Sequence, residues 1–238
     1  MANEQEEIIV EEGVVDKATL WFDKNKKSVF IIGGAVVAII GGYFAYKYLY
    51  VNKREAKATA ALYENKKDMG VTAPFTNFEH GNFRLAAEGA ESGKGLNKIV
   101  KEYGSTKSGA VAEYMYGISL MNLGAENPEN YDNAIKVLEN VDFGDDEVML
   151  TTIAIGAIGD CLIEKGEFAK AAAKYLEAAK RQPNELTTPI FLKKAGVAYE
   201  ENGEASKAVG LYEQIKNDYP TSSEFRDIDK YIARAKNS

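Results

Sequence analysis

The chain has 238 residues, of which 45% are hydrophobic and 27% are charged, as is usual for a protein with a folded core. Its formal net charge of −7 argues against a general nucleic-acid binder, because affinity for phosphate needs clustered Lys and Arg. The single cysteine, Cys161, and the single histidine, His80, exclude an internal disulfide, a multi-cysteine zinc site and any site with two imidazoles, and no cofactor is expected.

Residues 1–27 are predicted to form an N-terminal tail whose first dozen residues lack regular structure. From Val14 the stretch VVDKATLWF spaces its apolar side chains as a short amphipathic helix does. A helix of this kind lies in the membrane interface with its apolar face toward lipid. The tail is therefore predicted to carry one short amphipathic segment.

Residues 28–50 are predicted to form a transmembrane anchor. Residues 28–46 contain no charged side chain, and at about 1.5 Å rise per residue such a helix approaches the roughly 30 Å of a bilayer's hydrocarbon core. Tyrosines crowd the far end, where rings prefer the headgroups. A buried core helix is one alternative. A cleaved signal peptide is another, but GGYFAYKYLY lacks the small residues of a cleavage site. Four cations flank each side, so charge does not set the orientation.

Within the anchor, Gly34, Ala38 and Gly42 recur at every fourth position and form one face of small residues. Such a face lets a second helix approach closely, so it is a predicted helix-packing face. The alternative is that glycine is simply common in membrane helices.

Downstream, residues 162–183 and 199–220 align without a gap at a distance of 37 residues. With the residues that precede them, both copies follow the spacing of the tetratricopeptide repeat, a large residue followed by L-G-x2-Y, then A-x3-F, then P. The identical positions inside the two strings are Glu164/Glu201, Gly166/Gly203, Glu167/Glu204, Lys170/Lys207, Ala171/Ala208, Tyr175/Tyr212 and Pro183/Pro220.

The repeated residues have steric roles. Gly159 and Ala171 let the two helices of a pair approach, and Gly166 is placed at the turn, where a positive φ suits glycine. Tyr175 is expected to fill the seam between neighbouring units, and Pro183 ends the second helix because proline has no N–H. The same roles recur 37 residues later. Because one helix pair cannot bury its own apolar face, such units stack.

The predicted fold is all-α, a single N-terminal transmembrane helix followed by a tetratricopeptide-repeat helical solenoid. Residues 51–109 are expected to hold a linking helix and a degenerate first repeat, with helices at 56–69 and 96–109 and a loop-like stretch at 70–85. Three repeats follow over residues 110–222, the first of them weaker and with a longer turn. Residues 223–238 are predicted to form a C-terminal capping helix.

No catalytic constellation is found, so the chain is predicted not to be an enzyme. His80 is expected on a surface loop, and Cys161 is expected to be a small buried hydrophobe on a packed helix. The acidic residues 145–147 lack the spaced oxygen ligands of a calcium loop and are expected to form a solvated turn or a helix N-cap.

Binding is the better candidate, because the first helices of stacked pairs line a concave surface. Three positions of each first helix face this surface, and several of them are apolar, which indicates a groove for a peptide or protein partner. The alternative is ordinary packing against a neighbouring loop or unit. The predicted groove contacts are Tyr114, Ile118, Met121, Asp160, Ile163, Lys193, Val197 and Glu200, with Gly156 at one further position.

The architecture resembles YfgM-type proteins, which are tetratricopeptide-repeat ancillary subunits of the bacterial Sec translocon. The segments that carry the resemblance are KATLWFDKNKKSVFIIGGAVVAIIGGYFAY, GAIGDCLIEKGEFAKAAAKY and DIDKYIARAK. The resemblance implies a single-pass protein of the bacterial inner membrane, with a cytoplasmic N-terminus and a periplasmic repeat domain. It further implies contact with membrane lipid, the SecYEG translocon, a PpiD-like membrane chaperone and translocating polypeptides. The alternative is a structural scaffold for another cell-envelope assembly.

Overall fold

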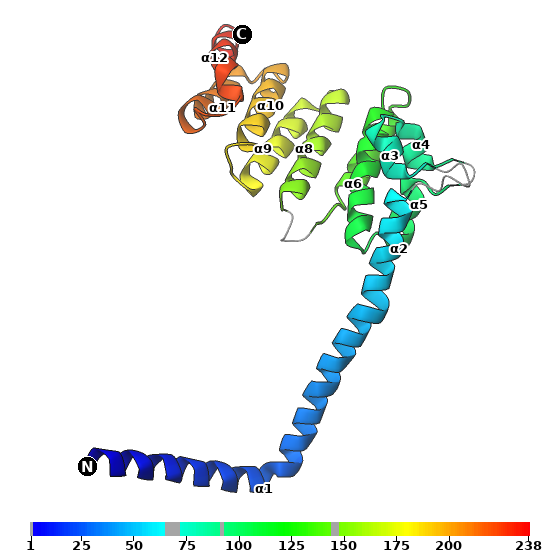
Figure 1. Ribbon diagram of the computed structural model, residues 1–238. Helices are drawn as coiled ribbons and strands as arrows, with labels where there is room; N and C mark the ends of the chain where they lie inside the picture. Colours follow the sequence, from blue (N-terminus) through cyan, green and yellow to red (C-terminus); the bar gives the residue numbers. More distant parts are fainter. Residues whose placement is uncertain (1, 65–71, 91–92, 144–147) are drawn as a thin grey trace. The chain divides into compact units, whose positions relative to one another are not determined.

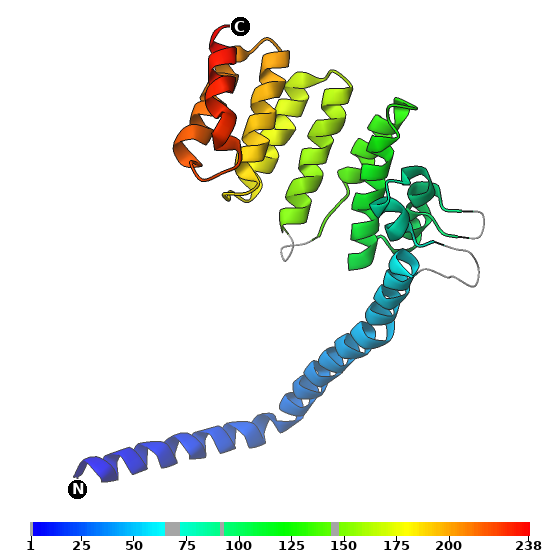
Figure 2. The ribbon, with the colours of Figure 1, turned by 45° about the horizontal axis from the view of Figure 1, so that its top comes forward.

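The computed structural model describes residues 2–64, 72–90, 93–143 and 148–238, and every regular element in these ranges is a helix (Figures 1 and 2). The chain divides into two compact units, Met1–Lys53 and Arg54–Ser238. Each unit is described separately below.

The first unit contains the long helix α1 (Ala2–Tyr46) and the π-helical segment η1 (Lys47–Val51). The next helix, α2 (Asn52–Tyr63), lies almost wholly in the second unit. Because α1 begins at Ala2, the expectation that the first dozen residues lack regular structure was wrong. Residues 2–12 contain neither glycine nor proline, the two residues that most disfavour a helix interior.

The apolar part of this helix has no partner in the described chain. Ile31 and Val37, for example, are 72% and 69% exposed. Nothing lies within 4 Å of a Cβ built on Gly34 or Gly42, so the predicted small face is open. By length and composition, the helix that contains this stretch is the one helix in the described residues that is long and apolar enough to cross a membrane.

The second unit is a row of helical hairpins, with α8 beside α9 and α10 beside α11 (Figure 2). The prediction of an all-α solenoid of tetratricopeptide type is confirmed. Its helices are α3 (Pro74–Glu79), α4 (Phe83–Glu88), α5 (Leu96–Tyr103), α6 (Lys107–Asn122), α7 (Glu129–Leu138), α8 (Val148–Glu164), α9 (Phe168–Arg181), α10 (Thr188–Glu201), α11 (Ala205–Asp218), the 3-10 segment η4 (Glu224–Asp227) and α12 (Ile228–Lys236).

The two matching hairpins pack as their sequences predict. Gly166 and Gly203 sit in the turns with φ of 72° and 76°, a region that favours glycine. A Cβ on Gly196 would lie 2.3 Å from Cε1 of Tyr212, so only glycine leaves room for the ring. In the earlier α6–α7 hairpin, Leu138 takes the place of the tyrosine and packs against Gly117. Glycine on the first helix and a large side chain on the second therefore fit together.

The region before α6 differs from its prediction. Residues 70–85 were expected to be loop-like, but 74–79 and 83–88 form α3 and α4, because Pro74 is well placed in the first turn of a helix and α4 buries Ala86 and Ala87. The single helix expected at 96–109 is instead α5 and α6, because Thr106 Oγ1 accepts the N–H of Gly109 and caps a new helix at 3.0 Å.

The linking helix belongs to the folded unit. Ala58 and Leu62 of α2 are fully buried in a cluster with Leu96 and Ile99 of α5. The helix expected at 56–69 corresponds to α2, which ends at Tyr63, and residues 65–71 lie outside the described part. A second, larger cluster runs from α6 to α12.

Two charged side chains of α2 hold the turn between α5 and α6. The Arg54 guanidinium donates to the carbonyl oxygen of Glu102 near the end of α5, at 2.6 Å. The Glu55 carboxylate accepts the backbone N–H groups of Lys107 and Ser108 at 2.8 and 2.9 Å, and the Ser108 hydroxyl at 2.6 Å. A cation near a helix C-terminus and an anion at a helix N-terminus are both favourable. The turn is thus bridged by residues about fifty positions earlier.

Glu55→Gln is expected to lower the free energy of unfolding by about 1–2 kcal/mol at pH 7, the usual value of a helix N-cap. Burial by itself raises the pKa of Glu55, but the hydrogen bonds from Ser108, Lys107 and Thr59 together lower it below its usual value. A carboxylate with a lowered pKa stabilises the fold above its unfolded-state pKa, and this contribution is lost as the pH falls through the folded-state pKa.

The measurement is urea unfolding of the full-length protein in detergent between pH 7 and pH 3, followed by circular dichroism. The difference between wild type and Glu55→Gln should shrink below about pH 4.3, the ordinary glutamate pKa. Glu177→Gln removes an exposed carboxylate that pairs with Lys174 and serves as the matched control. A difference that stays constant over the whole pH range would contradict the capping role.

Candidate protein-binding groove

An open cavity of ≈ 380 Å³ lies between the first helices α8 and α10 and the segment η4. Its apolar lining consists of Ile163 from α8 and Ile190 and Val197 from α10, all of them partly exposed. Ile163, Lys193 and Val197 were predicted as groove contacts, and the structure brings these three together. The complete lining is Ile163, Tyr175, Ile190, Lys193, Lys194, Val197 and Glu224.

Lys193 is the central polar group of this cavity. Its Nζ lies 2.5 Å from Oε2 of Glu224 and 4.7 Å from the centre of the Tyr231 ring. The two charged side chains are only 23% and 18% exposed, so the pair is largely shielded from water. Burial lowers the pKa of Lys193, but the hydrogen bond and charge of Glu224 outweigh it and raise the pKa. The lysine therefore stays charged.

Asp160, another predicted contact, is occupied within the fold. Its Oδ1 accepts a hydrogen bond from the Tyr175 hydroxyl at 2.6 Å. Its Oδ1 and Oδ2 also accept hydrogen bonds from Nζ of Lys194, at 2.7 and 3.0 Å. Burial, and then the hydrogen bond to Asp160, raise the pKa of Tyr175 above its usual range, so the phenol remains a donor. Asp160 thus satisfies the hydroxyl of the repeat tyrosine.

Glu200 has the same role in the next hairpin. Its Oε1 accepts the Tyr212 hydroxyl at 2.6 Å, and Arg234 of α12 donates to its two oxygens at 2.7 and 2.9 Å. The hydrogen bond from Arg234 lowers the pKa of Glu200 despite burial, and the side chain is only 11% exposed. Glu200 therefore attaches α12 to the last repeat and presents little surface to a partner.

Each of the two hairpins that contains a buried tyrosine, Tyr175 or Tyr212, also contains an acidic residue that accepts the hydrogen bond of its hydroxyl, Asp160 or Glu200. In the α6–α7 hairpin the tyrosine is replaced by Leu138, which has no hydroxyl, and the equivalent first-helix positions carry Ile118 and Met121. A buried hydroxyl needs an acceptor, whereas a leucine needs none. The signal in the sequence was that each hairpin with a tyrosine at this place has one acid among its predicted groove positions, Asp160 or Glu200, although the two acids occupy different repeat positions.

The remaining predicted contacts lie on α6, away from this cavity. Tyr114, Ile118 and Met121 are partly buried and pack against the larger core cluster. None of them lines the cavity between α8, α10 and η4. Sequence reasoning missed two residues of the lining, Ile190 and Glu224. Ile190 lies one helical turn before Lys194. The position of Glu224 depends on the path of the chain after α11 and left no signal in the repeat pattern.

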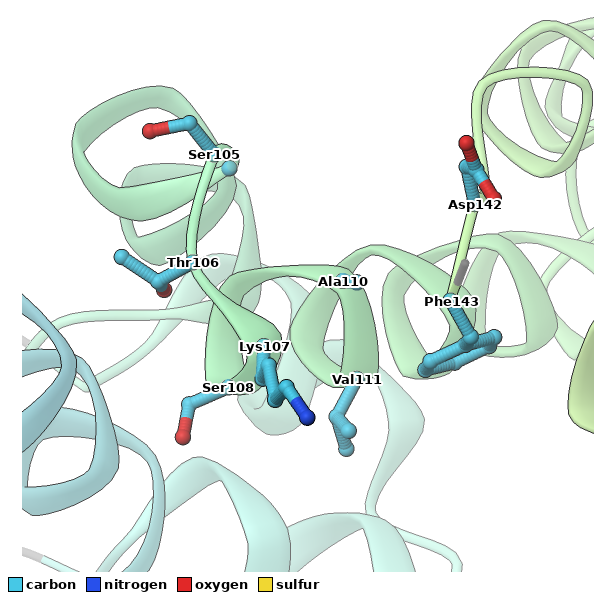
Figure 3. Close-up of a pocket in the computed structure, with 9 residues that line it drawn as sticks. Ser105, Thr106, Lys107, Ser108, Ala110, Val111, Asp142 and Phe143 are labelled. Atoms are coloured by element: carbon cyan, nitrogen blue, oxygen red, sulfur yellow. The ribbon is translucent and has the colours of Figure 1, made fainter. Parts of the chain in front are cut away.

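Another cavity, of ≈ 370 Å³, lies at the turn between α5 and α6. Figure 3 shows Ser105 and Asp142 on either side of it, contributed by different segments. Its other hydroxyls are already used in the fold, because Thr106 caps α6 and Ser108 bonds to Glu55. These two hydroxyls therefore serve the start of α6.

The two residues with potential reactivity stand apart. Cys161 is fully buried, and burial, followed by the charge of Asp160, raises the pKa of its thiol to about 12. Thiolates are the reactive form, so this thiol is inert at neutral pH. His80 follows α3 and is exposed. No group of three potential metal ligands occurs among the described residues, and the acidic stretch 145–147 lies outside them.

Comparisons with known proteins agree with the hairpin geometry. A model of the tetratricopeptide-repeat family matches residues 194–222, which include α11 and two of the four α10 residues that line the cavity, Lys194 and Val197. A candidate kinesin light chain of Podospora anserina, a structure of nearly identical tetratricopeptide-like repeats, is similar with a TM-score of 0.51 and 16% identity. The similarity covers 69% of this chain and 82% of that chain, and at this identity it shows the fold alone. No curated protein matches the sequence.

Proposed function

We propose that this tetratricopeptide-repeat protein is a membrane-anchored adaptor without enzymatic activity, which binds a protein partner in the concave surface of its solenoid. The observation that carries the proposal is the cavity of ≈ 380 Å³, in which Ile163, Ile190 and Val197 remain accessible between successive first helices. Stacked helical repeats use such concave surfaces to bind partners. Accessible aliphatic side chains there supply the apolar area that such binding needs.

The anchor in this proposal is the apolar part of α1, whose side chains are exposed in the described chain. A lipid bilayer is the environment that removes such a surface from water. Gly34, Ala38 and Gly42 are proposed as the face on which another membrane helix packs. The resemblance to YfgM-type proteins supports a cytoplasmic N-terminus and a periplasmic solenoid in the inner membrane.

The proposed partners follow from the same resemblance. The solenoid associates with SecYEG and a PpiD-like chaperone, and it assists translocating polypeptides on the periplasmic side. Copurification of the full-length protein from digitonin-solubilised membranes tests this. Wild type should recover Sec components, and Ile163→Lys should reduce recovery of the groove-bound partner several-fold, because a charge enters the apolar lining.

The matched control is Met149→Lys, which adds the same charge to an exposed apolar side chain at the start of α8. Recovery of no Sec component, under conditions that keep the translocon intact, would refute the proposed partners. Full recovery of every partner by Ile163→Lys would refute the groove as the binding surface. Protease treatment of spheroplasts tests the orientation, because a periplasmic solenoid is digested and a cytoplasmic one is protected.

A structural scaffold is the second candidate, and a cavity on the opposite set of helices favours it. This cavity, of ≈ 430 Å³, lies between the second helices α7 and α9, and its larger apolar lining residues are Ile135 from α7 and the largely buried Ile158 and Leu162 from α8. Lys165 crosses its edge and pairs with Asp132 and Glu167. A scaffold that assembles through this outer surface should form a stable homo-oligomer by sedimentation, and a monomer at all concentrations would count against it.

A further inference from the structure

The two lysines of the groove are paired in different ways. Lys194 pairs with Asp160, which lies on a repeat helix and also accepts the buried Tyr175 hydroxyl. Lys193 pairs with Glu224, which lies on the four-residue segment η4 between the last repeat and α12. The acceptor of Lys194 is therefore required by the core, whereas the acceptor of Lys193 is not.

The segment η4 is weakly held compared with α12. None of its four residues is buried, and Phe225 is 37% exposed. Its start is held by the Phe225 N–H, which donates to Ser222 Oγ at 3.3 Å, and by Thr221, whose hydroxyl bonds to Glu185 at 3.0 Å. By contrast, α12 buries Ile228 and Ala235. The docking of α12 therefore rests on its own buried side chains and does not depend on the Lys193–Glu224 pair.

Lys193 also has a contact that does not involve Glu224. Its ammonium lies over the Tyr231 ring at 4.7 Å, and Tyr231 packs edge-on against the buried Tyr212 at 5.4 Å. A largely shielded ammonium without an acceptor is unfavourable, so the site requires a carboxylate from some source. Exchange of one carboxylate for another keeps the ion pair and avoids that penalty.

We propose that Glu224 is the resident occupant of a carboxylate-binding site at Lys193, and that the partner polypeptide replaces it with a carboxylate of its own. An aliphatic side chain beside that carboxylate then enters the lining formed by Ile163, Ile190 and Val197. The inference rests on the proposed function of the groove and adds the chemistry of the partner, an acidic residue next to an aliphatic one. Glu224 acts as an internal competitor that sets the affinity.

Fluorescence anisotropy of labelled peptides with the full-length protein in detergent tests the exchange. The probes are acetyl-Ser-Gly-Ile-Glu-Ile-Gly-Ser-amide, the same peptide with Gln in place of Glu, and acetyl-Ser-Gly-Ser-Gly-Ile with a free C-terminal carboxylate. Wild type should bind the Glu peptide about tenfold more tightly than the Gln peptide, as expected for one charge-assisted hydrogen bond. The third peptide separates a C-terminal carboxylate from a side-chain carboxylate as the source.

Glu224→Gln should tighten binding of the Glu peptide several-fold, because the internal competitor no longer carries a charge. Lys193→Met should abolish the difference between the Glu and Gln peptides. Glu213→Gln is the matched control, because it removes the same charge from α11, where Glu213 pairs with Lys236 outside the groove. This control should leave all three dissociation constants within about twofold, as is usual for surface substitutions.

Unchanged or weaker binding of the Glu peptide by Glu224→Gln would overturn the exchange. Equal binding of the Glu and Gln peptides by wild type would also overturn it. If that equal binding is lost in Ile163→Lys, the groove still binds polypeptide and the proposed function stands without the exchange. If neither the Glu peptide nor the peptide with a free C-terminal carboxylate binds wild type or Glu224→Gln, the carboxylate site is refuted. The copurification experiment then tests separately whether the groove binds a protein partner.

Discussion

Tyr212→Ala is expected to lower the free energy of unfolding of the solenoid by about 3–5 kcal/mol, the usual cost of removing a buried aromatic side chain. Tyr212 is fully buried, and its ring occupies the space that Gly196 leaves open. The ring also packs edge-on against Tyr231 of α12, at 5.4 Å between centroids. Its removal leaves a cavity where two hairpin helices and the capping helix meet, and rigid neighbours cannot close it.

Tyr212→Phe separates the ring from the hydroxyl. The phenylalanine keeps the packing but loses the 2.6 Å hydrogen bond to Glu200, which retains two hydrogen bonds from Arg234. The expected loss is therefore about 1 kcal/mol, as for one hydrogen bond. Urea unfolding of the full-length protein, followed by circular dichroism, measures both values, with Glu213→Ala as the exposed control on the same helix. A loss below about 1 kcal/mol for Tyr212→Ala would contradict this account of the hairpin.

Leu62→Ala is expected to destabilise the second unit by about 2–5 kcal/mol, although the residue lies on α2, ahead of the repeats. Leu62 is fully buried in the cluster that contains Leu96 and Ile99. Alanine would remove this contact and leave a cavity between α2 and α5. The solenoid would then lose part of the apolar surface that covers its N-terminal end, which stacked repeats require for stability.

Urea unfolding and hydrogen exchange of α5 and α6 measure this effect. The amides of both helices should exchange faster in Leu62→Ala, because their covering element is weakened. Lys57→Ala alters an exposed side chain on the same helix, beside the buried Ala58, and should stay within about 0.5 kcal/mol of wild type. An unchanged midpoint for Leu62→Ala would mean that the folded domain begins after α2.

The repeat region was predictable because its interactions lie within one repeat or between adjacent ones. The repeated sequence pattern predicts the packing of the glycines against the tyrosines, Gly159 against Tyr175 and Gly196 against Tyr212. It also predicts the positive φ at Gly166. The region before α6 has no second copy for comparison. There, short helices formed at 74–79 and 83–88 in a stretch with the turn-forming residues of a loop.

The candidate site was predictable only in part. Ile163 and Val197 were found because repeat position alone directs them into the concave surface. Asp160 and Glu200 occupy equally concave positions, but they accept hydrogen bonds from tyrosine hydroxyls. As groove contacts, Tyr114, Ile118 and Met121 stay predictions. The position of a residue in the repeat shows which surface its side chain faces. It does not show whether that side chain already forms a hydrogen bond or ion pair with a neighbouring residue.

The sequence by itself determined that this chain is a helical solenoid with one long apolar helix before it, because helix periodicity, glycine turns and apolar length are local properties. The tertiary structure decided which charged groups are internal. Arg54 and Glu55 cap helices about fifty residues away, Arg234 holds Glu200, and Glu224 reaches Lys193. Each of these pairs joins two segments that are far apart in the sequence and that the stacking of the helices brings close together. No local sequence pattern encodes that spatial proximity.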